Sequence, residues 1–241
     1  MIKTRIDLPQ NTRVDEVSMR QLFANYLFAK KNNGECIIRI NDLKPYKDGR
    51  VFKNIEQKLN LLGLSQDEIK SKYFKQSEHN TLYKKYIDEL IEKGSAYYAF
   101  DTPEELDNIR EEYNAQNKTF IYNSKNREKF RNSFTLTKNE VDKLLEANTP
   151  YVIRFKVPKK EIYELKCGFD GDRSVKNFYD PFHDIIISEG NIPRFWFTDL
   201  VNNHHQEITD VIEGSVMIPI ILHYNLICDI LKLNKPKFYF L

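Results

Sequence analysis

Apolar and polar positions alternate at the start of the chain in a pattern that predicts a strand, a helix and a second strand. The strand is expected over 2–8, the helix over about 18–32, and the second strand over 36–40, after Gly34. Such a sequence forms a βαβ unit, whose two strands pair in parallel. We therefore predict an α/β fold.

In sheets of this kind, ligands bind at the carboxyl end of the first strand, against the helix that follows. The corresponding loop, 9–17, contains no glycine and carries Asp15 and Glu16. Glycine lets the backbone approach a phosphate closely, so its absence predicts a loop poorly suited to a nucleotide.

The same periodicity predicts the remaining elements. Helical spacing is found over 48–62, 78–94, 102–117, 137–148, 193–203 and 217–233, and strand patterns over 96–100, 151–157, 185–187 and 208–212. Thr102 and Thr137, each followed three residues later by a glutamate, are typical of helix N-caps.

Helices and strands alternate at both ends of the chain, and a more polar, mixed segment lies between them. This organisation predicts one α/β domain split by an insertion, with a first half at 1–98, an inserted domain at 99–183 and a second half at 184–241. The insertion contains YNSKNREKFRNS, a basic stretch with aromatic residues, in which Lys125, Arg127, Lys129 and Arg131 are the candidate phosphate contacts. An ordinary solvated loop is the equally weighted alternative.

Composition excludes several classes of protein. The 241 residues include 30% charged residues at a formal net charge of +2, which by itself does not argue for nucleic-acid binding. Three cysteines without a metal-binding spacing predict neither a zinc site nor a disulfide framework. The start of the chain does not resemble a signal peptide, and no apolar run reaches membrane-spanning length. We therefore expect a cytoplasmic protein without a membrane partner.

Several segments match, in order and spacing, the motifs of one enzyme family. They are LFANYLFAK, IIRIND, LNLLGL, KQSEHNTLYKKYIDELIEKGSAYYAFDTPEEL, PYVIRFKVP and ITDVIEG. On these segments the chain resembles the catalytic half of glutamyl-tRNA synthetase, a class I aminoacyl-tRNA synthetase, of the bacterial type without the zinc-binding insert. The resemblance implies a Rossmann-like parallel sheet split by an inserted α+β domain that binds the acceptor end of tRNA. It also implies that no structural zinc is present.

The sequence departs from the family where the chemistry is expected. The HIGH tetrapeptide, which holds the adenylate phosphates, falls on Asp15, Glu16, Val17 and Ser18. Two carboxylates would then face a triphosphate, and one like-charge pair about 4 Å apart costs roughly 4 kcal/mol at an effective dielectric near 20. The family's KMSKS-type loop and anticodon-binding region are expected to lie beyond Leu241.

The glutamate-binding positions also differ. Arg5 is retained and is suited to a carboxylate, whereas an acid of the family is Asn41 and a tyrosine is Phe195. The arginine of the VIRGEDH motif is Glu213, and the family's VVDDH segment ends here as Val201-Asn202-Asn203-His204. These five positions, Arg5, Asn41, Phe195, His204 and Glu213, are the candidate ligand-binding residues.

The residues lead us to predict a catalytically degenerate, truncated paralogue that does not adenylate glutamate and needs neither cofactor nor metal. Its role would be binding or regulatory, with the tRNA acceptor end, a carboxylate ligand, or a protein partner such as a full-length synthetase as candidates. The alternative is an active ligase or an aminoacyl-tRNA-dependent transferase with an altered substrate, which as a ligase would use ATP and magnesium. The sequence does not identify the ligand or the partner.

Overall fold

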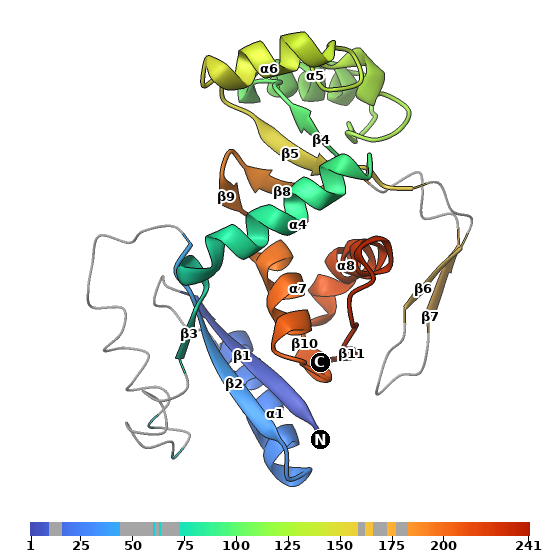
Figure 1. Ribbon diagram of the computed structural model, residues 1–241. Coiled ribbons are helices and arrows are strands. Elements are labelled where there is room, and N and C mark those ends of the chain that lie inside the picture. Colours follow the sequence, from blue (N-terminus) through green and yellow to red (C-terminus); the bar gives the residue numbers. More distant parts are fainter. Residues whose placement is uncertain are drawn as a thin grey trace. The chain divides into compact units, whose positions relative to one another are not determined.

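The computed structural model of the protein describes residues 1–9, 16–43, 60, 63, 73–158, 162–165, 173–176 and 183–241. The helix predicted over 48–62 lies outside this part of the chain, apart from residue 60. The chain divides into two compact units (Figure 1). Unit 1 comprises 1–83, 164–173 and 195–241, and unit 2 comprises 84–163 and 174–194. Domain boundaries near residues 98 and 183 stay a prediction.

Unit 1 opens with the predicted βαβ unit. Strand β1 (Lys3–Pro9), helix α1 (Glu16–Lys31) and strand β2 (Glu35–Asn41) follow one another, and β1 pairs with β2 in parallel along its full length. Strand β3 (Tyr73–Lys75) extends the sheet on the other side of β2, also in parallel. The prediction of an α/β fold with a parallel sheet is confirmed.

A second parallel pair lies beside β1. It joins β10 (Asp210–Glu213) to β11 (Lys237–Phe240). The side-chain amide of Asn25, on α1, donates to the carbonyl oxygen of Ile212 (2.9 Å) and accepts from its backbone N–H (3.0 Å). This buried amide therefore replaces two bonds of a strand ladder and fixes β10 against the first βαβ unit.

The other elements of unit 1 are mainly helical. The 3₁₀ turn η1 (Gln76–His79) leads into α4 (Asn80–Glu92), within which the boundary between the two units falls. Helix α7 (Phe195–His205), the turn η3 (Ser215–Met217) and helix α8 (Ile218–Leu231) complete the unit, and α7 packs against α8.

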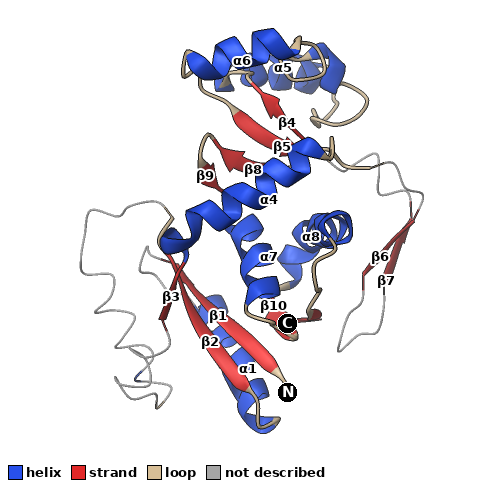
Figure 2. Cartoon of the chain, in the orientation of Figure 1, coloured by secondary structure: helices blue, strands red, loops and turns tan. Residues whose placement is uncertain are grey.

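Unit 2 is built on an antiparallel sheet, coloured red in Figure 2. Its strand order is β4 (Ala96–Ala99), β5 (Val152–Phe155), β8 (Ile186–Glu189) and β9 (Ile192–Pro193). The helices are α5 (Pro103–Ala115), η2 (Arg127–Lys129) and α6 (Lys138–Glu146). Both predicted helix caps are confirmed as capping boxes, Thr102 with Glu105 and Thr137 with Glu140.

Two features of the structure do not follow from the sequence pattern. The last residues form β11, a strand of four residues whose pairing with β10 cannot be recognised from its own sequence. The apolar face of α4 is formed by Tyr83, Ile87 and Leu90, together with Tyr86, while Leu82 is only half-buried. Strands β6 (Ile162–Leu165) and β7 (Arg173–Lys176) pair with each other.

We predict that Gly34→Ala destabilises the protein more than Gly94→Ala does. The backbone carbonyl of Ile2 accepts from Glu35 N (2.9 Å), and a Cβ on Gly34 would overlap that carbonyl oxygen, so β1 and β2 must move apart. The expected loss is about 3 kcal/mol, near the upper end of overpacking costs.

Gly94 serves as the control, because its Cβ would meet open space. There only the strain of its left-handed backbone (φ 65°) remains, about 1 kcal/mol. Urea denaturation of the two variants measures the difference, and equal losses would contradict a tight contact at Gly34.

Candidate functional site

Unit 1 contains a cavity of about 340 Å³ between β1, α1, α7 and β10. Its wall combines charged and polar side chains with apolar ones. The lining residues are Arg5, Ile6, Asp7, Leu8, Gln21, Leu22, Asn25, Asn41, Phe195, Asp199, Ile212, Glu213, Val216 and Met217.

Arg5 stands at the centre of the charged part of the wall. Its NH2 donates to Glu213 Oε1 at 2.7 Å and lies 3.6 Å from Asp199 Oδ2, and its NH1 contacts the carboxylate of Asp7. Only 7% of Arg5 is exposed. Burial opposes the charge of this guanidinium, but the three carboxylates outweigh burial and raise the pKa of Arg5.

Glu213 is held in place from two sides. Its Oε1 accepts from Arg5, and its Oε2 accepts from the side-chain amide of Gln21 at 3.2 Å. Glu213, a carboxylate of the chain itself, is therefore already paired with the Arg5 guanidinium that an anionic ligand would need.

A second arginine supports the acids from behind. Asp7 and Arg39 are direct partners in the register of β1 and β2, and Arg39 NH1 lies 3.7 Å from Asp7 Oδ1 and 4.0 Å from Asp199 Oδ1. Arg39 is fully buried, its Nε donates to Gln206 Oε1 at 2.6 Å, and it does not line the cavity. Burial lowers the pKa of Arg39, but a guanidinium stays protonated in proteins.

Asp199 is the most perturbed carboxyl group of this cluster. Burial, followed by the charge of Asp7, raises its pKa to about 7, against the opposing effect of Arg5 and Arg39. Gln76 donates to Asp199 Oδ1 at 3.2 Å. The three acids therefore exceed the two arginines by one negative charge, which protonation of Asp199 removes near neutral pH.

Four of the five predicted ligand-binding residues line the cavity: Arg5, Asn41, Phe195 and Glu213. Phe195 is 46% exposed at its edge. His204 is the exception, because it lies at the other end of α7 and is not part of the cavity wall. Its Nδ1 accepts from the backbone N–H of Asn234 at 3.1 Å, which gives this histidine a structural role.

The tetrapeptide aligned with HIGH is only partly described. Asp15 lies outside the described residues, and Glu16, Val17 and Ser18 form the first residues of α1, with side chains that are not described. The predicted effect of these residues on phosphate binding stays a prediction.

The basic stretch of unit 2 separates into one buried and three exposed residues. Arg127 is 5% exposed, its NH2 donates to Asp184 Oδ1 at 3.1 Å, and its Nε lies 3.0 Å from Oδ2. This buried ion pair, with Tyr97 donating to Asp184 at 2.6 Å, makes Arg127 part of the core. We therefore withdraw Arg127 from the candidate phosphate contacts.

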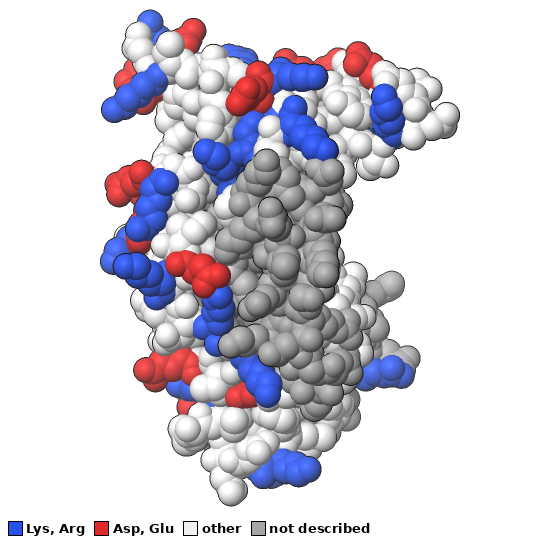
Figure 3. Space-filling view, turned by 90° about the vertical axis from the view of Figure 1, so that its right-hand side faces the viewer, with Lys and Arg blue, Asp and Glu red and all other residues white. Residues whose placement is uncertain are grey.

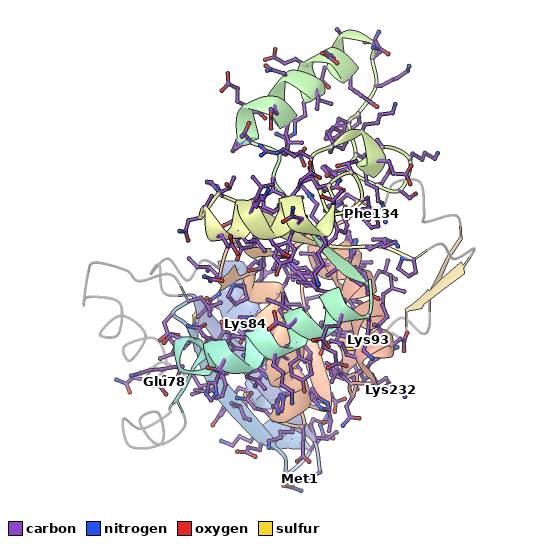
Figure 4. All side chains as sticks on the ribbon, turned by 45° about the horizontal axis from the view of Figure 1, so that its top comes forward. Met1, Glu78, Lys84, Lys93, Phe134 and Lys232 are labelled. Carbon is purple, nitrogen blue, oxygen red and sulfur yellow. The ribbon has the colours of Figure 1, made fainter. Side chains whose placement is uncertain are left out.

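Lys125, Lys129 and Arg131 are exposed. Near them lies the exposed ring of Phe134, labelled in Figure 4, with Lys156 Nζ 4.9 Å from its centroid. On the face drawn in Figure 3, basic and acidic side chains of the described residues are interspersed. This face is thus mixed in charge, in agreement with the small net charge of the chain.

Sequence reasoning missed Asp7, Asp199 and Gln21 as members of the site. Two local signals point to the acids: Asp7 follows Arg5 by two residues on one strand, and Asp199 follows Phe195 by four on one helix. Both spacings place side chains on a common face.

Two further properties concern the described residues alone. They include no group of three or more His, Cys, Asp or Glu side chains placed to hold a metal ion. None of their helices is long and apolar enough to cross a membrane.

Comparison with known proteins gives a consistent result. The family model "tRNA synthetases class I (E and Q), catalytic domain" matches residues 18–241. A glutamate–tRNA ligase of Christiangramia forsetii is 38% identical over 229 residues, covering 91% of this chain and 45% of the relative. One from Flavobacterium johnsoniae is 35% identical over 231 residues, with the same two coverages.

Solved structures agree with these sequences. A crystal structure of the glutamate–tRNA synthetase from Elizabethkingia anophelis superposes with a TM-score of 0.89 at 32% identity, covering 100% of this chain and 50% of that chain. A glutamate–tRNA ligase from Elizabethkingia meningosepticum, solved in complex with its amino acid, gives the same score and identity. The chain spans about half the length of these relatives.

We predict a stability effect of Asp199 that depends on pH. Its folded pKa of about 7 lies above the ordinary value of 3.8, so the folded state keeps a proton that the unfolded chain releases. The stabilisation is complete below pH 4 and is lost as pH rises through 7, at a slope of at most about 1.4 kcal/mol per pH unit. Asp199→Asn removes this contribution to the slope.

Urea denaturation from pH 4 to pH 8 measures the effect. Val201→Ala, which shortens a buried neighbour on α7 without removing a titratable group, is the control and should give a curve parallel to that of the wild type. A parallel curve for Asp199→Asn as well would contradict the raised pKa.

Proposed function

Because the chain belongs to the class I tRNA synthetases of the E and Q type, we propose that it is a binding protein with their catalytic-domain fold that does not adenylate glutamate. The observation that carries this proposal is the ion pair between Arg5 and Glu213, 2.7 Å long. Glutamate would have to compete with an internal carboxylate already fixed by Arg5 and Gln21. Its side chain would also meet the charges of Asp7 and Asp199, which repel it.

The tRNA acceptor end is the macromolecular ligand we propose for unit 2. Three observations support it: the family to which the chain belongs, the exposed cations Lys125, Lys129 and Arg131, and the exposed ring of Phe134. Cations contact phosphates, and an exposed aromatic ring offers a surface on which an unpaired base can stack. Neither requires the adenylation reaction.

The remaining candidates have less support. A carboxylate ligand in the cavity meets the same internal competitor as glutamate does. A protein partner, such as a full-length synthetase, has no described surface that points to it in particular.

An active ligase is the second candidate, and the names of the relatives favour it. The relatives are glutamate–tRNA ligases at up to 38% identity, and Arg5 lies in the cavity where an amino acid would be bound. This candidate requires Arg5 to exchange Glu213 for the substrate carboxylate.

We predict that the purified chain catalyses no ATP–pyrophosphate exchange above background at millimolar glutamate, with or without tRNA. The reason is that Arg5 is already paired, so glutamate is not held in the position that adenylation needs. Its relatives from Flavobacterium johnsoniae or Christiangramia forsetii provide the positive control. Turnover well above background would refute the proposal and favour the active ligase.

We predict that Glu213→Arg binds glutamate about tenfold or more tightly than the wild type does. The change removes the internal competitor and adds a cation, and an interaction of only 1.4 kcal/mol is worth a factor of ten. Calorimetric titration with glutamate measures the affinity, and Glu189→Arg, at an exposed ion pair with Arg194 in unit 2, controls for the added charge. If both variants bind glutamate equally, Glu213 is not the competitor.

For tRNA we predict a salt-dependent affinity that the triple variant Lys125→Ala, Lys129→Ala, Arg131→Ala reduces. Each lost phosphate contact lowers the slope of log K against log salt by about one, so the slope should fall by about three. The control removes Lys84 on α4 and Lys93, which directly follows α4; both are labelled in Figure 4. An unchanged slope in the triple variant would show that these cations do not contact tRNA.

A further inference from the structure

The charges that face the cavity are unequal. Among the described residues of its wall, one cation, Arg5, faces three acids, Asp7, Asp199 and Glu213. Arg39 compensates a second charge from behind the wall, at 3.7 Å from Asp7 and 4.0 Å from Asp199. The two arginines therefore compensate two of the three acids. The third acid leaves one negative charge at the cavity surface when all three are ionised.

The hydrogen bonds of these acids are also incomplete. Glu213 receives two donors, Arg5 and Gln21, and Asp199 receives Gln76. Both carboxylate oxygens of Asp7 are buried and accept no well-formed hydrogen bond from the described residues, although they lie close to Arg5 and Arg39. Asp7 is compensated by the charges of Arg5 and Arg39, so the capacity to accept a ligand's N–H groups lies with Asp199 and Glu213, because a carboxylate oxygen can accept more than one hydrogen bond.

The rest of the wall is apolar. Leu8, Leu22 and Ile212 form part of its buried surface, and Met217 and the exposed Val216 and Phe195 extend it outward. A volume of about 340 Å³ is at the lower end of the range of small-molecule sites, roughly 300–1,000 Å³. The cavity therefore suits a compact molecule with an apolar body.

We infer that this cavity binds an organic cation of metabolite size, in which an ammonium or guanidinium group meets Asp199 and Glu213 and an apolar body meets Leu22, Ile212 and Met217. The inference rests on the proposed function, in which the cavity does not bind glutamate for adenylation. It adds the chemical class of the ligand that would bind there in place of glutamate.

The alternatives fit less well. An anion meets three acids and only one cation, which is already paired. A metal ion requires several carboxylate oxygens that converge on one point, and the described residues include no group of side chains placed to hold one. An organic cation instead needs only one or two hydrogen bonds from the acids of the wall, and its apolar body fits the remaining lining.

The protonation of Asp199 provides independent support. The groups facing it are Arg5 and Asp7 of β1, Arg39 of β2, Gln76 of η1, Glu213 of β10 and the phenol of Tyr83 on α4. Without a ligand, burial and Asp7 raise the pKa of Asp199, so a proton supplies the missing positive charge. A bound cation would displace that proton, and affinity would rise from pH 6 to pH 8.

The experiment compares three molecules that share one body: 3-phenylpropylamine, 3-phenylpropanol and 3-phenylpropionate. They carry a positive, a neutral and a negative end, so differences in affinity report the charge preference alone. Calorimetric titration of the full chain should show the amine binding about tenfold or more tightly than the alcohol, a factor that corresponds to 1.4 kcal/mol, and the acid binding least. Titration in two buffers of different ionisation enthalpy should show proton release with the amine near pH 7.

Variants test the residues. Asp199→Asn should weaken the amine about tenfold and abolish proton release, and Asp88→Asn, at an exposed ion pair with Lys84, is the matched control. If Asp199→Asn does not fold, Asp7→Asn and the proton release of the wild type carry the test.

Equal affinities for the three molecules, a preference for the acid, or no binding at millimolar amine would each overturn the inference. These outcomes differ from the result that would refute the proposed function, namely pyrophosphate exchange with glutamate. If the chain shows neither exchange nor a preference for the amine, the proposed function stands and only the inference about the ligand class is refuted.

Discussion

The ion pair between Arg5 and Glu213 determines what the cavity can bind. Arg5 is buried, so its guanidinium loses most of its hydration, and it is stable only because carboxylates surround it. Those carboxylates come from three separate strands and helices: β1, α7 and β10. The same interaction that stabilises Arg5 therefore joins distant segments of unit 1 and removes its capacity to hold an external anion.

The parallel pairing of β1 with β2 makes this cluster possible. It sets Asp7 directly beside Arg39, and the buried amide of Asn25 fixes β10 so that Glu213 reaches Arg5. The fold thus supplies a fixed frame, and the charges within it decide the ligand. Because the strands pair through their backbones and not through the side chains of Glu213 or Asp199, the same frame can present different charges to a ligand.

Much of this fold follows from local sequence. Alternating and helical spacing, together with the capping boxes at Thr102 and Thr137, predicted most elements to within a few residues, because these signals act between near neighbours. Strand β11 was missed because its stability comes from pairing with β10. Arg127 was misjudged for a related reason: its partner Asp184 is 57 residues away, and sequence alone does not distinguish a solvated arginine from a buried, paired one.

Prediction of the site from the sequence is limited in the same way, and to a greater extent. Resemblance to a family located Arg5, Asn41, Phe195 and Glu213 at one cavity, because relatives share the frame. It did not reveal that Glu213 bonds to Arg5 and Gln21, or that Asp199 joins them, since these contacts depend on side chains 192 or more residues apart meeting in space. The sequence therefore shows the change of charge at position 213, whereas only the structure shows what the new carboxylate contacts. A substitution read from sequence as the loss of one substrate contact becomes, in the folded chain, the gain of an internal ligand for Arg5.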